Sequence, residues 1–282
     1  DVPERYILCG SGAAELIYAY CDALRPVRSA ELAPTFSEYG AAAAHFGARI
    51  ARCLLTAPDF DPDDRLLAFL EAQKPDVLFL CTPNNPTGRT LPRALLESVL
   101  ALAARQGTRV LLDECFLDFA DAESAKALLP RYPNLLILKA FTKSYALAGV
   151  RVGYCLTADA ALLSDMAACT QPWNVSLLAQ AAGVAALREQ DWLTRAKEIL
   201  TCERPYMTQE LTQLGFSVCP SEANYLLFSA PVGLDAALLR EGIAIRSCAN
   251  YAGLGAGWYR TAVRLREENE ALLDAMRRVT EE

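Results

Sequence analysis

Three apolar runs in this sequence each lead into polar side chains, at regular intervals along the chain. The runs cover 77–80, 110–112 and 135–138, and Asn85, Asp113 and Lys143 follow them. Short continuous apolar runs are typical of parallel strands that are buried on both faces. Successive ends lie about 30 residues apart, the length of one strand, one helix and their connections. The pattern predicts an α/β fold in which neighbouring strand ends bring these side chains to one site.

The rest of the chain reads as further strands and helices. We expect strands at 6–9 and 49–55, and helices at 16–24, 65–73 and 92–106. A further helix is expected to open in the segment 34–39 and to run through His45. The last third predicts helices at 182–200, 203–214, 234–241 and 268–278, with strands at 216–218, 223–228, 243–245 and 259–265. We therefore expect a large domain over 1–185, whose mostly parallel sheet has helices on both faces, and a small α/β domain over 186–282.

Charge and composition narrow the class of protein. A net charge of −7 argues against a nucleic-acid surface, and no apolar run approaches the length that spans a membrane. The ten cysteines contain no C-x-x-C pair, so we expect reduced thiols in a cytoplasmic protein and neither a zinc site nor a disulfide framework. The single histidine, His45, lies in an alanine-rich helical stretch. No metal site is expected.

Several candidate site residues have two interpretations from the residues alone. The small-residue turn at 10–14 leads into a helix, whose free amides suit a phosphate, but such turns are also common without a ligand. Asp113 can reach into the site, cap a helix or pair with a cation. Arg260 and Arg264 alternate along one predicted strand, which also fits a solvated pair of arginines.

Four motifs together give the chain a family resemblance. They are Asn84-Asn85-Pro86-Thr87-Gly88, Asp113-Glu114, Thr142-Lys143 and Gly149-Val150-Arg151-Val152-Gly153. With them the chain resembles the fold-type I pyridoxal-phosphate enzymes of the aminotransferase superfamily, in the branch that holds histidinol-phosphate aminotransferases and threonine-phosphate decarboxylases. The resemblance implies pyridoxal 5′-phosphate as cofactor, a small phosphorylated amino acid as substrate, and a homodimer.

The resemblance also implies roles for single residues around the cofactor. Lys143 would attach the cofactor as a Schiff base, and Asp113 would pair with its pyridinium nitrogen. Asn85 would bind the ring's phenolate oxygen, Phe36 would stack on the ring, and Phe116 would lie beside it. The implied phosphate site consists of Gly12, Ala13, Ala14, Thr142 and Arg151. Lys139 would be a bystander.

On the substrate side, the resemblance implies that Arg260 binds the α-carboxylate and Arg246 the phosphate, with Asn85 also contacting the substrate. Residues 171–176 and 245–254 are more similar to the decarboxylases, and so is Phe116, where most of the aminotransferases have tyrosine. We therefore expect L-threonine O-3-phosphate to be decarboxylated to (R)-1-amino-2-propanol O-2-phosphate for cobalamin biosynthesis.

Two alternatives remain open from the sequence. One is an aminotransferase of the histidinol-phosphate type, and the other is a non-catalytic protein that binds an effector with this fold. Family members also have an arm ahead of the position of Asp1 that closes the substrate pocket. The sequence starts after that arm and after the first elements of the large domain, which leaves two interpretations open: a truncated protein, or a longer one of which the given sequence is a part. Cofactor binding could survive a truncation, whereas closure of the pocket would then be in doubt.

Overall fold

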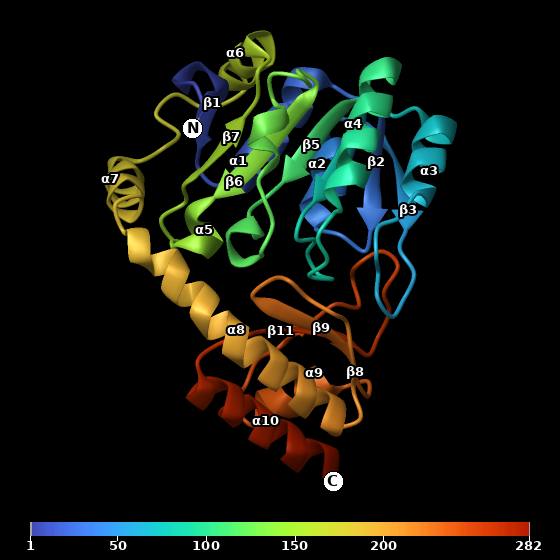
Figure 1. Ribbon diagram of the computed structural model, residues 1–282, viewed down its shortest axis with the longest axis vertical. Coiled ribbons are helices and arrows are strands. Elements are labelled where there is room, and N and C mark those ends of the chain that lie inside the picture. Colours follow the sequence, from blue (N-terminus) through green and yellow to red (C-terminus); the bar gives the residue numbers. More distant parts are fainter. Residues whose placement is uncertain (1, 282) are drawn as a thin grey trace.

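The computed structural model describes residues 2–281 and contains two sheets with helices packed on them (Figure 1). The larger sheet has seven strands in the order β1-β7-β6-β5-β4-β2-β3. Strands β3, β2, β4, β5 and β6 pair in parallel, whereas β7 is antiparallel to both β6 and β1. The bounds are β1 Ile7–Gly10, β2 Arg28–Ala33, β3 Arg49–Leu54, β4 Val77–Cys81, β5 Arg109–Asp113, β6 Leu135–Ala140 and β7 Gly153–Leu156. The predicted α/β fold with a mostly parallel sheet is confirmed.

Helices cover both faces of this sheet, and β4 shows why its sequence is apolar throughout. Phe79 packs in the core beneath α1 Ala13–Leu24, α2 Ser37–His45 and α6 Ala160–Ala168. Leu78 and Leu80 point the other way, into the core beneath α3 Arg65–Gln73 and α4 Arg93–Gln106. Because successive side chains of a strand alternate between faces, a strand covered on both faces must be apolar at every position.

Two strands of the larger sheet have no counterpart in the prediction: β7, and the buried strand β2. Its position 31 is a glutamate, which interrupts the apolar pattern, yet Glu31 is only 5% exposed. The Arg52 Nε donates a hydrogen bond of 2.8 Å to the Glu31 Oε1 from the neighbouring edge strand β3. A buried carboxylate is tolerated when a cation pairs with it, and that pairing cannot be read from the local pattern.

The smaller sheet is antiparallel, in the order β10-β11-β9-β8. Its elements are β8 Ser217–Val218, β9 Tyr225–Ser229, β10 Arg246–Ser247 and β11 Trp258–Ala262, with α9 Leu234–Arg240 and α10 Arg266–Glu281. The prediction of a strand at 243–245 is wrong, because the Ile243 amide donates to the Leu238 carbonyl and so belongs to the end of α9. Pairing begins at Arg246, directly opposite Arg260.

The helices predicted at 182–200 and 203–214 also need correction. The structure has α7 Leu177–Ala186 and then one continuous helix, α8 Gln190–Gln213, with Pro205 inside it. An interior proline costs a helix about 3 kcal/mol. Leu200 before it and Met207 and Leu211 after it are buried in one core, so packing on both sides of Pro205 offsets that cost. Figure 1 shows α8 running from the larger sheet down to the smaller one.

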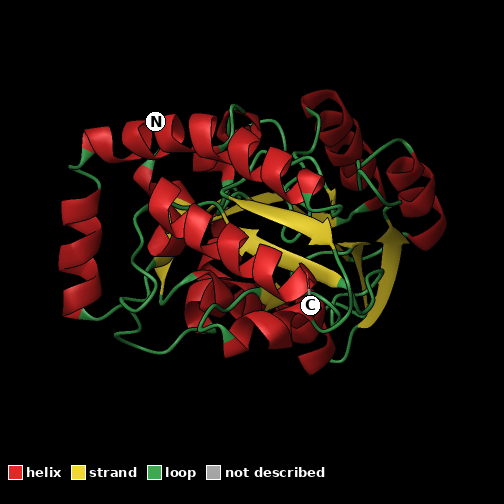
Figure 2. Cartoon of the chain, turned by 90° about the horizontal axis from the view of Figure 1, so that it is seen from below, coloured by secondary structure: helices red, strands yellow, loops and turns green. Residues whose placement is uncertain are grey.

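The remaining elements are short: α5 Phe141–Ser144 and the 3-10 helices η1 Glu4–Tyr6, η2 Leu117–Phe119 and η3 Ala125–Leu128. Figure 2 shows the strands enclosed between helices when the molecule is seen from below. The predicted domain boundary at 185/186 falls at the end of α7 and stays a prediction. The outer ends of the two predicted domains, Asp1 and Glu282, lie outside the described residues. Over residues 2–281, no helix has the length and apolar character needed to cross a membrane.

Candidate active site

A cavity of about 430 Å³ lies at the carboxyl ends of β4, β5 and β6, and Arg246 and Arg260 of the smaller sheet also line it. Asn85, Asp113 and Lys143 all line it, as the spacing of the three strand ends predicts. The other predicted site residues that line it are Ala13, Ala14, Phe36, Phe116, Thr142, Arg151, Arg246 and Arg260. Gly12 does not line the cavity but lies directly against Arg151. The roles of these residues stay predictions.

Asp113 ends β5 and is 5% exposed. The Cys115 amide donates to its Oδ1 at 2.8 Å, and the Tyr39 hydroxyl donates to its Oδ2 at 2.6 Å. Burial raises the pKa of Asp113, and these two hydrogen bonds oppose the rise because they favour the carboxylate. Both donors are neutral. A buried carboxylate held by neutral donors fits a cationic group of a ligand, such as a protonated ring nitrogen.

Two lysines, Lys139 near the end of β6 and Lys143 just beyond it, have opposite environments. Lys139 pairs with Asp118, Nζ to Oδ1 at 2.8 Å, and although burial lowers its pKa, Asp118 and Glu114 together raise it above the ordinary value. Lys143 lines the cavity, and burial, with Arg260 and Arg151 nearby, lowers its pKa. A neutral amine is the form that attacks a carbonyl. The environment of Lys143 therefore fits covalent attachment of an aldehyde cofactor, whereas Lys139 is held as a cation.

The start of α1 forms a cradle for an anion. Gly12 precedes the helix at φ +84°, and no side chain caps the first amides. A Cβ at Gly12 would lie 2.6 Å from an Arg151 guanidinium nitrogen, and one at Gly153 would lie 3.0 Å from the Ala13 amide nitrogen. Glycine at these two positions lets β7 and Arg151 approach the helix start. Free amides beside a guanidinium fit a phosphate group.

Two aromatic residues give the cavity apolar walls. Phe36 immediately precedes α2, and its ring meets that of Tyr39 edge to face at 5.5 Å and 83°. Phe116 packs edge to face on Tyr225 at 4.9 Å, and the Lys143 Nζ lies 5.7 Å from the centre of the Phe116 ring. Walls of this kind fit a flat aromatic ligand whose polar groups point to the strand ends.

The smaller sheet contributes two arginines on adjacent strands. Arg260 is half-buried, and its guanidinium donates to the Asn85 Oδ1, to which the Tyr251 hydroxyl also donates at 3.3 Å. Since that oxygen is occupied, Asn85 offers the cavity its amide NH₂ as a donor. Arg246 is exposed and donates to the Asn250 Oδ1 at 3.2 Å. Arg264 lies beyond the end of β11, so the solvated-pair interpretation of Arg260 is wrong.

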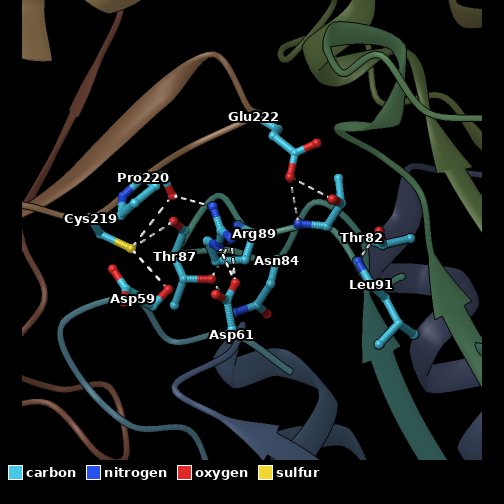
Figure 3. Close-up of polar contacts among 11 residues, drawn as sticks. Asp59, Asp61, Thr82, Asn84, Thr87, Arg89, Leu91, Cys219, Pro220 and Glu222 are labelled. Carbon is cyan, nitrogen blue, oxygen red and sulfur yellow. Dashed lines mark hydrogen bonds and ion pairs between the residues drawn. The ribbon is translucent and has the colours of Figure 1, made fainter. Parts of the chain in front are cut away.

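The turn that carries Asn85 is hydrogen-bonded to the connection between β8 and β9 of the smaller sheet (Figure 3). The Glu222 amide donates to the Gly88 carbonyl at 2.8 Å, and the Glu222 carboxylate accepts from the Thr90 hydroxyl at 2.5 Å. Arg89 forms an ion pair with Asp61 and also reaches the Pro220 carbonyl. These contacts fix the position of Asn85 relative to both arginines.

Three tyrosines that the sequence analysis did not identify also contact the site. Besides Tyr39 and Tyr251, the buried Tyr225 donates from its hydroxyl to the Asn84 carbonyl at 2.9 Å. One signal was available for Tyr39, because it lies three residues after Phe36 at the start of a helix, where both rings share a face. Tyr225 and Tyr251 come from the last third of the chain, and no local pattern connects them to the site.

Comparisons with known proteins agree with this geometry. A family model described as aminotransferase class I and II matches residues 1–276. The chain is 39% identical over 287 residues to the threonine-phosphate decarboxylase of Salmonella typhimurium, covering 99% of this chain and 78% of that protein. It is 36% identical over 288 residues to histidinol-phosphate aminotransferase 2 of Ralstonia nicotianae, covering 98% and 75%. The crystal structure of the histidinol-phosphate aminotransferase from Clostridium acetobutylicum superposes with a TM-score of 0.92 at 27% identity, covering 98% and 84%.

Proposed function

The chain belongs to the aminotransferase class I and II family and depends on pyridoxal 5′-phosphate, and from that premise we propose that it decarboxylates L-threonine O-3-phosphate. The product would be (R)-1-amino-2-propanol O-2-phosphate, a building block for cobalamin. The observation that carries the proposal is the pair Arg246 and Arg260, placed opposite each other on adjacent strands at the cavity. Two cations side by side suit a substrate with both a carboxylate and a phosphate.

The residues of the larger sheet would hold the cofactor. Lys143 would attach it covalently, Asp113 would keep its ring nitrogen protonated, and the amides at the start of α1 with Arg151 would bind its phosphate. When bound, the cofactor supplies an electron sink for the bond that breaks at the substrate Cα. Phe36 would cover one face of the ring. Phe116 cannot donate a hydrogen bond, so Asn85 would be the donor to the ring oxygen.

The two arginines would select which bond breaks. The bond that breaks must stand perpendicular to the cofactor ring, so the enzyme selects it by fixing the rotation of the substrate. Arg246, bound to the remote phosphate, would contribute that orientation with binding energy from a group that does not react. The Cα–carboxylate bond would break and CO₂ would leave, while the electron pair of that bond would pass to the bound cofactor. A proton taken up from solvent and delivered by the Lys143 Nζ would then replace the carboxylate on Cα.

A second candidate function is amine transfer of the histidinol-phosphate type. The 36% identity to the Ralstonia enzyme favours it, and it would use the same cavity and the same Lys143. The difference would be that the Cα–H bond stands perpendicular to the ring and Lys143 removes that proton. Histidinol phosphate has no carboxylate, so Arg260 would bind the α-carboxylate of 2-oxoglutarate and glutamate in the other half of the reaction.

Product analysis tests the proposal. The cofactor-loaded protein is incubated with threonine phosphate in the absence of a keto acid, and separately with histidinol phosphate and 2-oxoglutarate, with Lys143→Ala as the inactive control. We expect CO₂ and aminopropanol phosphate in the first reaction and no glutamate in the second. Glutamate formation without CO₂ would assign the aminotransferase. Cofactor binding with neither product would assign a non-catalytic, effector-binding protein.

We also propose a homodimer that resides in the cytoplasm. Several exposed apolar side chains in residues 173–187 support the first point: Trp173 is 96% exposed, Leu177 80% and Leu178 81%. All ten cysteines are free thiols, which supports a reducing compartment. Leu178→Glu should lower the molar mass measured by light scattering from dimer to monomer, whereas Leu239→Glu, at an exposed position of α9, should leave it unchanged. A monomeric wild type would contradict the dimer.

A further inference from the structure

We infer that Tyr39 is a positioning residue that holds Asp113 in its ionised form and so keeps the cofactor's ring nitrogen protonated. No motif indicates this role, and it acts through Asp113 without requiring contact between Tyr39 and the substrate. The inference rests on the proposed function only in one respect, that Asp113 faces the ring nitrogen. It is independent of which bond of the substrate is broken.

The position of the Tyr39 hydroxyl is fixed by packing on two sides of its ring. Tyr39 is fully buried, and its ring stacks on Phe79 of β4 at 5.5 Å with 7° between the planes. Phe36 contacts the same ring edge to face. Between these two contacts the ring has one orientation, which directs its hydroxyl to the Asp113 Oδ2 at 2.6 Å. A donor fixed in advance costs little entropy when it forms its bond.

The Tyr39 hydroxyl is the donor in this hydrogen bond. Burial and the charge of Asp113 raise the pKa of Tyr39 well above its ordinary range, so the phenol remains a neutral donor. The Cys115 amide, which cannot accept a hydrogen bond at all, donates to the other oxygen. Both groups donate to Asp113, and both bonds oppose the rise in its pKa because they stabilise the carboxylate.

The Tyr39 hydroxyl affects the cofactor because Asp113 and the ring nitrogen would share one proton. Asp113 and the ring nitrogen would compete for that proton, and each donor to the carboxylate shifts it toward the nitrogen. Removing the Tyr39 hydroxyl leaves the carboxylate more basic, so the proton moves toward Asp113. A hydrogen bond to a charged group is worth about one pKa unit or more, which is about tenfold in this balance.

The chain offers a matched control in Tyr20. Tyr20 of α1 is also fully buried and meets the same neighbour, Phe79, edge to face at 6.3 Å and 73°. Among residues 2–281 its hydroxyl has no hydrogen-bond partner. Tyr20→Phe therefore makes the same chemical change beside the same phenylalanine without touching Asp113.

The test is the ¹⁵N chemical shift of the ring nitrogen in protein loaded with ¹⁵N-labelled pyridoxal phosphate. We expect Tyr39→Phe to move the signal toward that of neutral pyridine and to lower turnover about tenfold, while Tyr20→Phe matches the wild type. In an Asp113→Asn background, Tyr39→Phe should produce no further change, because its effect passes through the carboxylate. Tyr39→His, which restores an N–H donor, should return the signal toward the wild type.

The outcomes separate this inference from the proposed function. If Asp113→Asn leaves the nitrogen signal unchanged, the proposed role of Asp113 is wrong. If Asp113→Asn shifts the signal and folded Tyr39→Phe does not, the inference about Tyr39 is wrong. Should Tyr39→Phe fail to fold, folded Tyr39→Leu, which also lacks a donor, takes its place: a wild-type signal would overturn the inference, and a signal shifted toward neutral pyridine would support it.

Discussion

The two sides of the candidate site are built differently. On the side of the larger sheet, Asp113 is buried and held by two fixed donors at the end of a central strand. On the side of the smaller sheet, Arg246 is exposed on a two-residue edge strand and bonds to the nearby Asn250. Arg260 is intermediate, half-buried and bonded across the cavity to Asn85.

This difference indicates a division of labour between the sheets. Groups fixed in advance at strand ends suit a resident cofactor, whose polar atoms must meet partners that do not move. Exposed arginines on a short strand suit a substrate that enters and leaves. Substitutions on the larger-sheet side should therefore remove chemistry, whereas those on the smaller-sheet side should weaken substrate binding and change the choice of bond.

The largest effect is expected from Lys143→Ala. It should abolish the long-wavelength absorbance of the lysine-bound cofactor and lower turnover at least about a thousandfold, because the attaching amine is gone. Lys139→Ala is the control. It should retain the absorbance and lower the unfolding temperature, since Asp118 loses its cation. Normal absorbance in Lys143→Ala would disprove the assignment.

Asp113→Asn should come next. The variant should still bind the cofactor but lose about 3 kcal/mol of transition-state stabilisation, measured as the change in kcat/KM. Glu114→Gln is the matched control, since this neighbouring carboxylate is buried too but bonds to Ser124 and the Ala125 amide outside the cavity. It should affect stability more than turnover. Near-normal turnover of Asp113→Asn would show that Asp113 is only structural.

The two arginines should show smaller and different losses. Arg260→Ala and Arg246→Ala should each weaken threonine phosphate binding by about 1.5–3 kcal/mol, seen as a higher KM with the cofactor absorbance intact. Arg246→Ala should also convert part of the cofactor to pyridoxamine phosphate, because the substrate can then rotate. Arg264→Ala, whose ion pair with Glu268 lies outside the site, should behave as wild type. Equal KM values in all three variants would contradict the division of labour.

The smallest effect concerns pH. The rate of cofactor attachment to the apoprotein follows the neutral fraction of Lys143, whose pKa is lowered by burial and then by Arg260. Attachment should therefore persist below the pH at which an ordinary lysine is protonated. Arg260→Leu removes a nearby positive charge, which raises the pKa of Lys143 and moves the fall in rate to higher pH. A shift to lower pH, or none, would contradict the coupling between these residues.

The same division explains what could be predicted from the sequence. Strand ends of a parallel sheet meet at one edge, so the regular spacing of Asn85, Asp113 and Lys143 predicts that these side chains share one site. In the structure all three line the same cavity. The strand β2 was missed because Glu31 breaks the apolar pattern and its partner Arg52 comes from another strand. The course of α8 through Pro205 depends on core packing, which no local propensity describes.

In the smaller sheet, local pattern was a weaker guide. The apolar residues 243–245 predict a strand, but the Ile243 amide donates to the Leu238 carbonyl at the end of α9. Strand pairing with β11 therefore begins only at Arg246. Tyr39, Tyr225 and Tyr251 reach the site through contacts between distant segments. Sequence spacing therefore describes the side of the site that stands on regular parallel strands, and tertiary packing decides the remainder.

The central claim is that the smaller sheet's arginines direct the larger sheet's cofactor machinery to the carboxylate bond. Its most direct test is a single-turnover reaction of the loaded protein with threonine phosphate labelled in its carboxyl carbon. Labelled CO₂ and the final form of the cofactor are both counted. We expect one labelled CO₂ for each substrate consumed, with the cofactor recovered as pyridoxal phosphate. Conversion to pyridoxamine phosphate with no labelled CO₂ would contradict the claim and assign the chain to amine transfer.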